Sequence, residues 1–279
     1  MNQNIIKLSL LFYLTTLTLL LHADPTPNRV IIIGTKHNGN KEITHSRLLK
    51  VLEKIKPDII LLEVDSTMAT NCSIRKVWGT KTAEFLGIWR NPLEYTAARK
   101  YAEQNKDVCI APFDIYIPNR KSYIDYQLKM ERSHTAALQQ LAVEKKYSLA
   151  DSMAYHQYRS INNAFMAELK KDLLSINRET LIDTAQRIIA FESKEIRAIT
   201  NHYPTLEPFQ NWYNYSNDFW TFRNKGMCER IYRELLANSD RTIVILTGLL
   251  HKYYLSDYLN NPNLSKLCEV IPLSKALEK

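Results

Sequence analysis

Residues 29–37 read RVIIIGTKH, and this short stretch decides what kind of fold the chain adopts. Its four consecutive β-branched residues are typical of a strand that is buried on both faces, as in a parallel sheet. Gly34 ends the run, and His37 follows three residues later. The sequence therefore predicts a buried strand over 29–33 with a histidine just beyond its carboxyl end.

The residues after this strand alternate between helical and strand patterns. Apolar residues recur at mostly helical spacing over 43–55, and a second buried strand is expected over 58–64 (DIILLEV). A helix over 92–105 opens with a proline at a favoured position, and a weaker third strand follows over 108–113. This order predicts an α/β fold with a mainly parallel central sheet flanked by helices, because parallel strands need helical crossovers.

A helical segment interrupts the alternation. Residues 119–200 carry no strand pattern and predict two to four helices, inserted in the middle of the chain. Residues 201–222 contain eight aromatic residues and predict either a lid or substrate wall, or a loop packed beneath the insertion. The remaining elements are expected to be a helix over 218–237, a strand over 242–247 (TIVILT) and a last strand over 266–272.

Residues 1–23 are typical of a secretory signal peptide. Lys7 precedes an uncharged stretch over 8–21, which is shorter than the roughly 20 apolar residues that span a membrane. Ala23 fits the last residue before a cleavage site. Cleavage would leave one domain over 24–279, periplasmic or secreted and without a stable membrane anchor, whereas an uncleaved anchor is the alternative.

The composition excludes several classes of protein. Hydrophobic residues make up 45% of the chain and charged residues 24%, as in an ordinary globular protein. The formal net charge of +8 is not concentrated in any basic run, so no nucleic-acid partner is expected. In an oxidising compartment the cysteines can form one or two disulfides or remain buried thiols, and their spacing leaves the pairing open for Cys72, Cys109, Cys228 and Cys268. The oligomeric state is equally open.

A Gly-x-x-His pattern occurs twice, each time after a predicted strand. The chain has no HExxH, G-x-S-x-G or P-loop motif. Instead, Gly34 precedes His37 and Gly248 precedes His251. Ligands of open parallel sheets bind beyond the carboxyl ends of the strands, and glycine lets the backbone approach them closely. Gly34 and Gly248 are therefore candidate substrate-binding positions, and the two histidines are candidate ligands of one metal ion.

Acidic residues follow the other two strands. Glu63 and Asp65 share one face at the end of the second strand, and Asp114 follows the third. Two histidines with one or two carboxylates suit manganese, cobalt or zinc. We therefore expect a divalent metal ion bound by His37, His251, Glu63 and Asp65, with a remaining carboxylate as general base and Asp114 near the substrate. The structural alternatives are an ion pair for Glu63 and caps for the two aspartates.

Arg223 is predicted near the start of the helix over 218–237, where Asn217 and Asp218 are candidate caps. A positive charge is unfavourable at a helix N-terminus, so another group is expected to hold it. It would neutralise Glu63, or bind a substrate carboxylate or oxyanion. A solvated arginine on the helix face is the alternative.

Four segments together resemble the TraB/GumN and Tiki family, which is related to erythromycin esterase and ChaN-like haem-binding proteins. They are GTKH at 34–37, KPDIILLEVDS at 56–66, TFRNKGMCERI at 221–231 and GLLH at 248–251. The resemblance implies that the active-site residues are His37, Glu63, Arg223 and His251. Tiki proteins are metal-dependent proteases that clip peptide amino termini. Lys36 departs from the family pattern, in which this position is often small or apolar.

The sequence and the resemblance together predict an exported metal-dependent hydrolase of a peptide or ester bond, acting on a peptide or small-molecule substrate. His37 and His251 would hold the metal, and Arg223 would stabilise developing negative charge. The alternative is a non-catalytic binding protein that holds haem, a peptide or a glycan in the same cleft. A third hypothesis is a module that sequesters an exported peptide without cleaving it.

Overall fold

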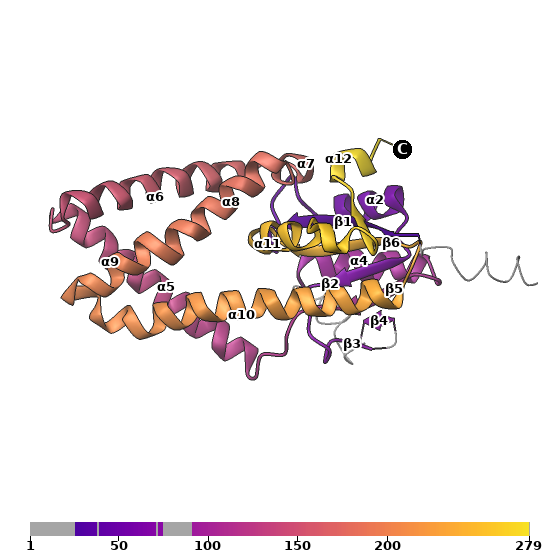
Figure 1. Ribbon diagram of the computed structural model, residues 1–279, viewed down its shortest axis with the longest axis horizontal. Coiled ribbons are helices and arrows are strands. Elements are labelled where there is room, and N and C mark those ends of the chain that lie inside the picture. The colour runs from indigo at the N-terminus through magenta and orange to yellow at the C-terminus, as the bar shows by residue number, and fades with distance from the viewer. Residues whose placement is uncertain (1–25, 38, 71, 75–90, 279) are drawn as a thin grey trace, which may run out of the picture.

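The β-branched runs of the sequence form adjacent strands of one sheet (Figure 1). The computed structural model describes residues 26–37, 39–70, 72–74 and 91–278. The five strands of the sheet are β1 (Asn28–Thr35), β2 (Ile59–Leu62), β5 (Cys109–Pro112), β6 (Thr242–Gly248) and β7 (Cys268–Val270). They pair in the order β5-β2-β6-β1-β7, and every pair is parallel. The predicted α/β class with a mainly parallel sheet is confirmed.

β1 lies near the centre of the sheet and is buried on both faces. Val30 and Ile32 pack into one apolar core, whereas Ile31 and Ile33 pack into the other. Successive side chains of a strand point to opposite faces, so an unbroken apolar run is what a strand covered on both sides requires. β6 divides its apolar residues between the same two cores.

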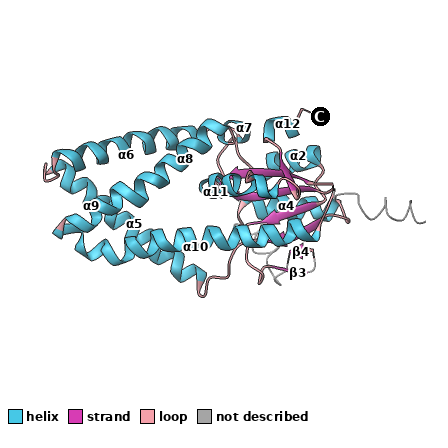
Figure 2. Cartoon of the chain, in the orientation of Figure 1, coloured by secondary structure: helices cyan, strands magenta, loops and turns pink. Residues whose placement is uncertain are grey.

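Helices cover both faces of the sheet (Figure 2). One core lies beneath α2 (His45–Ile55), α4 (Leu93–Gln104) and α12 (Leu273–Ala276). The other lies beneath the C-terminal half of α10 (Glu207–Ala237), most of α11 (Leu249–Leu259) and η3 (Pro262–Leu264). Each fully buried leucine or isoleucine contributes about 1.5–3 kcal/mol, so these two layers supply most of the stabilisation of the sheet.

A helical arm, residues 120–222, extends from the sheet between β5 and β6 (Figure 1). It comprises the first half of α10 with α5 (Arg120–Val143), α6 (Leu149–Glu168), α7 (Leu173–Ile176), α8 (Glu179–Phe191), η1 (Glu192–Ile196), α9 (Arg197–His202) and η2 (Pro204–Leu206). The arm has its own apolar core, in which Leu138 and Tyr155 lie with Tyr213. The segment predicted to be helical is helical, but α5, α6, α7, α8 and α9 are five helices rather than the two to four that were predicted.

The aromatic segment over 201–222 is largely helical, which corrects the expectation of a loop packed beneath the insertion. α10 begins at Glu207 with Pro208 in its first turn. Its aromatic residues pack against α5, where Trp212 Nε1 donates to Gln127 Oε1 at 2.7 Å. Much of the aromatic content of this segment therefore reflects helix packing inside the arm, whereas Trp220 stacks on His251.

The position of Arg223 differs from the prediction for the same reason. α10 runs for 31 residues from Glu207 to Ala237, so Arg223 lies near its middle. Asn217 and Asp218 consequently do not cap this helix, and the helix dipole does not explain how the arginine is held. The arginine is held instead by the side chains that accept its hydrogen bonds.

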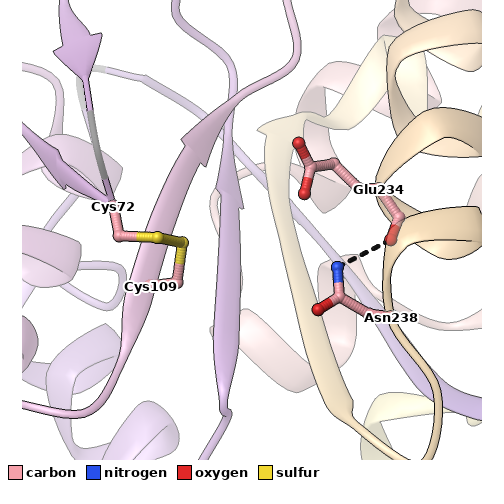
Figure 3. The surroundings of a disulfide bond; sticks show 4 residues. All are labelled: Cys72, Cys109, Glu234 and Asn238. Atoms are coloured by element: carbon pink, nitrogen blue, oxygen red, sulfur yellow. Dashed lines mark hydrogen bonds between the residues drawn. A yellow bond between two sulfur atoms is a disulfide. The ribbon is translucent and has the colours of Figure 1, made fainter.

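One disulfide joins Cys72 to Cys109 and ties a small hairpin to the edge of the sheet (Figure 3). The hairpin consists of β3 (Ala69–Thr70) and β4 (Ser73–Ile74), and Cys109 is the first residue of β5. Cys228 and Cys268 are buried free thiols. The pairing that the sequence left open is therefore one disulfide and two buried thiols.

The predicted signal peptide over 1–23 lies outside the described residues. Among the helices that the structure describes, none is long and apolar enough to cross a membrane. The longest of these, α10, buries Met227 and Ile231 against the sheet and is charged on its other side.

Candidate active site

The topology brings three strand ends together. β6 lies between β1 and β2, so the residues that follow these two strands face each other across the end of β6. Gly248 occupies that middle position, and a Cβ there would lie 3.0 Å from His37 Nε2 and 3.5 Å from Glu63 Oε2. Because Gly248 has no side chain, His37 Nε2 approaches Glu63 Oε1 to 4.0 Å.

Glu63 is a buried carboxylate whose oxygens are well satisfied. Its Oε2 accepts hydrogen bonds from Gly248 N at 2.6 Å and Thr247 Oγ1 at 2.8 Å, and its Oε1 accepts one from Arg223 Nη2 at 2.7 Å. Burial opposes its ionisation, yet the neighbouring His251, Arg223 and His37 and the Gly248 amide lower the pKa of Glu63 to about 2. The group is therefore an anion throughout the neutral range.

Arg223 lies at the centre of the site. Its Nε and Nη2 donate to Asp114 at 2.9 and 2.8 Å, Nη2 also donates to Glu63, and Nη1 donates to His251 Nε2 at 3.1 Å. These contacts use four of the five N–H groups of a guanidinium and leave one, on Nη1. Hydrogen bonds and the charges of Asp114 and Glu63 keep the pKa of Arg223 raised despite burial.

Asp114 and Asp65 both lie beside Arg120, and each also accepts a hydrogen bond from a backbone N–H close to it in the chain. Asp114 is fully buried and, besides Arg223, accepts from Arg120 Nη2 at 2.7 Å and Ile115 N at 2.8 Å. Asp65 Oδ1 accepts from the backbone and side chain of Thr67, and its Oδ2 lies 3.7 Å from Arg120 Nη1. The turn cap considered for Asp65 is thus present, and Asp114 is enclosed by arginines rather than open to a substrate.

Gly34 faces the arm. Its N–H donates to Asn177 Oδ1 at 2.8 Å, and its carbonyl accepts from Asn177 Nδ2 at 2.9 Å. A Cβ on Gly34 would lie 2.6 Å from Leu249 Cδ1, so the absence of a side chain here lets α11 pack closely against β1. The buried Lys252 donates to the same amide oxygen at 2.7 Å, and burial lowers the pKa of Lys252 to about 7. Gly34 therefore connects β1 to the arm.

His251 is buried and neutral. Its Nδ1 lies 2.8 Å from Asn224 Oδ1, and its ring stacks on Trp220 with centroids 4.2 Å apart. Burial, reinforced by the charge of Arg223, lowers the pKa of His251 to about 4, although Glu63 acts in the opposite direction. Both ring nitrogens are engaged, one by Asn224 and one by Arg223.

His37 is the exposed member of the site, with half of its side chain open to solvent. Its Nδ1 lies 3.0 Å from Glu94 Oε1, which also accepts from the Thr35 hydroxyl. Burial of the ring acts to lower its pKa, but the hydrogen bond that Nδ1 donates to Glu94 and the charges of Glu63 and Glu94 raise the pKa of His37 to about 9. Nε2 remains the nitrogen that faces Glu63.

This donor set does not fit the expected divalent metal. Arg223 donates to Glu63 Oε1 and His251 Nε2, and these are the lone pairs that a metal would use. A dication there would also lie beside a guanidinium of like charge. Asp65 faces Thr67 and Arg120. Within the described ranges, no group of three or more His, Cys, Asp or Glu side chains is arranged to hold a metal ion.

Three polar residues of the site were missed from the sequence. Glu94 orients His37, Thr247 binds Glu63, and Asn224 binds His251. Two weak signals were available: Glu94 lies two residues after Pro92 in a predicted helix start, and Asn224 directly follows Arg223. Neither position indicates its distant partner.

Comparisons with known proteins add no relative to this description. No family model matches the chain, and searches of curated proteins and of solved structures find no match either. The resemblance to the TraB/GumN and Tiki family therefore depends on the four short segments alone, and the function has to be argued from the geometry of the site.

Proposed function

We propose that this protein is an exported hydrolase of a peptide or ester bond, in which His37 rather than a metal ion carries out the proton transfers. The observation that supports this most directly is the pairing of His37 with Glu94. A buried carboxylate accepts from Nδ1 of a half-exposed imidazole, so that Nε2 is left free at the surface of the site.

The chemistry follows from this tautomer. With the Nδ1 proton shared with Glu94, neutral His37 accepts a proton from water at Nε2 while the water oxygen bonds to the substrate carbonyl carbon. The carbonyl π electrons move to oxygen, and the remaining N–H of Arg223 is the donor for that oxyanion. When the bond to the leaving group breaks, His37 returns the proton to the leaving oxygen or nitrogen. Glu63 stays ionised and holds Arg223 in place.

The surrounding network supports catalysis rather than a simple binding surface. Arg223, Glu63 and His251 are buried and mutually hydrogen-bonded, whereas His37 exposes one titratable nitrogen beside them. Fixed charges around one exposed proton acceptor are the arrangement that general acid–base catalysis requires. Export is supported by the predicted signal peptide and by the Cys72–Cys109 disulfide.

The proposal is tested with the metal-depleted mature chain, residues 24–279. Series of nitrophenyl esters and a mixed peptide library are offered to the wild type, His37→Ala and Glu94→Gln. We expect hydrolysis that survives chelation and falls roughly 10²–10⁴-fold in His37→Ala. The matched control is His202→Ala, because His202 is exposed on α9.

Hydrolysis that requires added zinc, manganese or cobalt would contradict the proposed mechanism. If all substrates remain intact in every condition while a peptide, haem or glycan binds, the binding-protein alternative replaces the hydrolase.

A further inference from the structure

Asn224 has a defined orientation, which the contacts of its amide establish. The residue is fully buried in α10, directly after Arg223. Its Nδ2 donates to the Trp220 carbonyl at 2.8 Å, and a carbonyl only accepts. The oxygen of the amide therefore faces His251, 2.8 Å from Nδ1. Since Asn224 Oδ1 accepts, Nδ1 of His251 carries the proton.

The other side of the His251 ring agrees with this tautomer. Nε2 lies 3.1 Å from Arg223 Nη1, and a guanidinium only donates. Nε2 therefore presents a lone pair. The hydrogen bonds run in one direction, from Arg223 to His251, from His251 to Asn224 and from Asn224 to the Trp220 carbonyl. A proton on Nε2 would place two donors against each other.

One face of α10 supplies the hydrogen-bond partners of both ring nitrogens and the ring that stacks on His251. Trp220, Arg223 and Asn224 are spaced by three and four residues, which places them on the same side of a helix. The Trp220 ring stacks on His251 at an interplanar angle of 16° and fixes the ring plane. The orientation of Arg223 thus depends on a histidine whose own orientation is set from the same helix.

We propose that Asn224 is a positioning residue that holds His251 as the Nδ1–H tautomer, and that His251 thereby orients Arg223 instead of binding a metal. This inference rests on the proposed function in one respect: the role of Arg223 as a donor to an oxyanion belongs to that proposal. The tautomer itself does not depend on any activity. A metal ion reaches Nε2 of His251 only if Arg223 leaves it.

The test is side-chain ¹⁵N NMR of the mature chain, with the His251 signals assigned by comparison with His251→Gln. The wild type is expected to show a protonated Nδ1 and an Nε2 lone pair at neutral pH. Asn224→Leu removes the acceptor for Nδ1–H and leaves only Arg223 to disfavour a proton on Nε2, so the fraction of the Nδ1–H tautomer is expected to fall. Asn224→Asp keeps an acceptor and is expected to retain the Nδ1 proton.

The matched control is Asn217→Leu. Asn217 lies two turns earlier in α10, and its Nδ2 donates in the same way to the Tyr213 carbonyl, at 2.9 Å. This variant should leave the His251 signals unchanged. The positioning role is overturned if the wild type shows an Nε2–H tautomer, or if Asn224→Leu, folded by circular dichroism, has the same fraction of the Nδ1–H tautomer as the wild type. Absence of hydrolysis in the wild type would bear on the proposed function alone.

Discussion

The backbone of Gly248 lies directly against the imidazole of His37, and a Cβ at this glycine would lie only 3.0 Å from Nε2. A side chain at position 248 would therefore press on the ring more tightly than ordinary van der Waals contact allows. The atom that it would crowd is Nε2, the nitrogen that the proposed reaction uses. Glycine is therefore required at position 248 because it leaves room for the ring of His37. The backbone conformation does not require it, since a φ of −60° is open to any residue.

Gly248→Ala is accordingly expected to displace His37 and to lower kcat/KM by about 10–100-fold, because small misplacements of a catalytic group are costly. The comparison variant is Gly226→Ala, whose Cβ would crowd Ile115 Cγ2 and touch no part of His37. Both should lose about 1–3 kcal/mol of unfolding free energy through overpacking, measured by urea titration. Equal activity losses in the two would show that the effect is general crowding.

The pH dependence of hydrolysis follows from the raised pKa of His37. Proton acceptance requires the neutral ring, and the ring is protonated below a pKa of about 9. kcat/KM is therefore expected to rise with pH, to be half-maximal near pH 9 and to level off above it. Glu94→Gln removes the Glu94 charge and the charge-assisted hydrogen bond that raises this pKa most, while the charge of Glu63 remains, so the inflection should move to lower pH. An inflection unmoved by Glu94→Gln would argue that His37 is not the titrating base.

Acid should destabilise the fold through two buried histidines. Burial lowers the pKa of His134 and of His251 from 6.5 to about 4. The unfolded chain binds these protons below pH 6.5 and the folded chain only near pH 4, so stability falls as the pH drops through this window. The expected loss is on the order of a few kcal/mol, read from urea midpoints at pH 7 and pH 4.5.

His134 allows this prediction to be tested outside the site. It lies in the arm, where its Nε2 donates to Thr200 Oγ1 at 2.8 Å and the rings of Phe209, Trp212 and Tyr213 surround it. His134→Gln keeps a donor and cannot titrate, so its acid sensitivity should be smaller than that of the wild type. An unchanged slope of stability against pH would assign the acid loss to other groups.

Arg223→Met should convert the site into one that accepts zinc. The substitution frees Glu63 Oε1 and His251 Nε2, which lie 3.6 Å apart, and removes the cation between them. It also leaves buried carboxylates without their partner, at a cost of about 3–5 kcal/mol. The variant is expected to have a lowered Tm that zinc partly restores, whereas zinc leaves the wild-type Tm unchanged.

The double variant Arg223→Met/Glu63→Gln serves as the reference, because it lacks the carboxylate and should lose the response to zinc. Stoichiometric zinc in the wild type, with a raised Tm, would show that Arg223 does not exclude the metal.

The three central strands, β1, β2 and β6, could be predicted from sequence because each is a continuous apolar run that ends at a recognisable residue. The runs before Gly34 and Gly248 each form a strand, and the residues just beyond them meet because parallel strands end at one edge. The convergence of His37, Glu63 and His251 follows from that rule.

The rest depends on distant contacts that local pattern does not encode. Arg223 comes from the middle of α10, and its partner Asp114 lies 109 positions away in the chain. Glu94 and Asn224 look like ordinary helix residues until the histidines that they bind are placed. The start of α10 was missed because its aromatic residues obscured the helical spacing that packs them against α5.

The central place of β6 has a consequence for the order of assembly. β1 and β2 are made early, yet neither pairs with the other, because β6 stands between them. The sheet cannot close until residues 113–241 have been synthesised and β6 has emerged from the ribosome. Folding of the core thus waits for long-range pairing, which is intrinsically slow. Such a delay would suit the export that is predicted from residues 1–23, because a chain has to be unfolded to pass through a translocation channel.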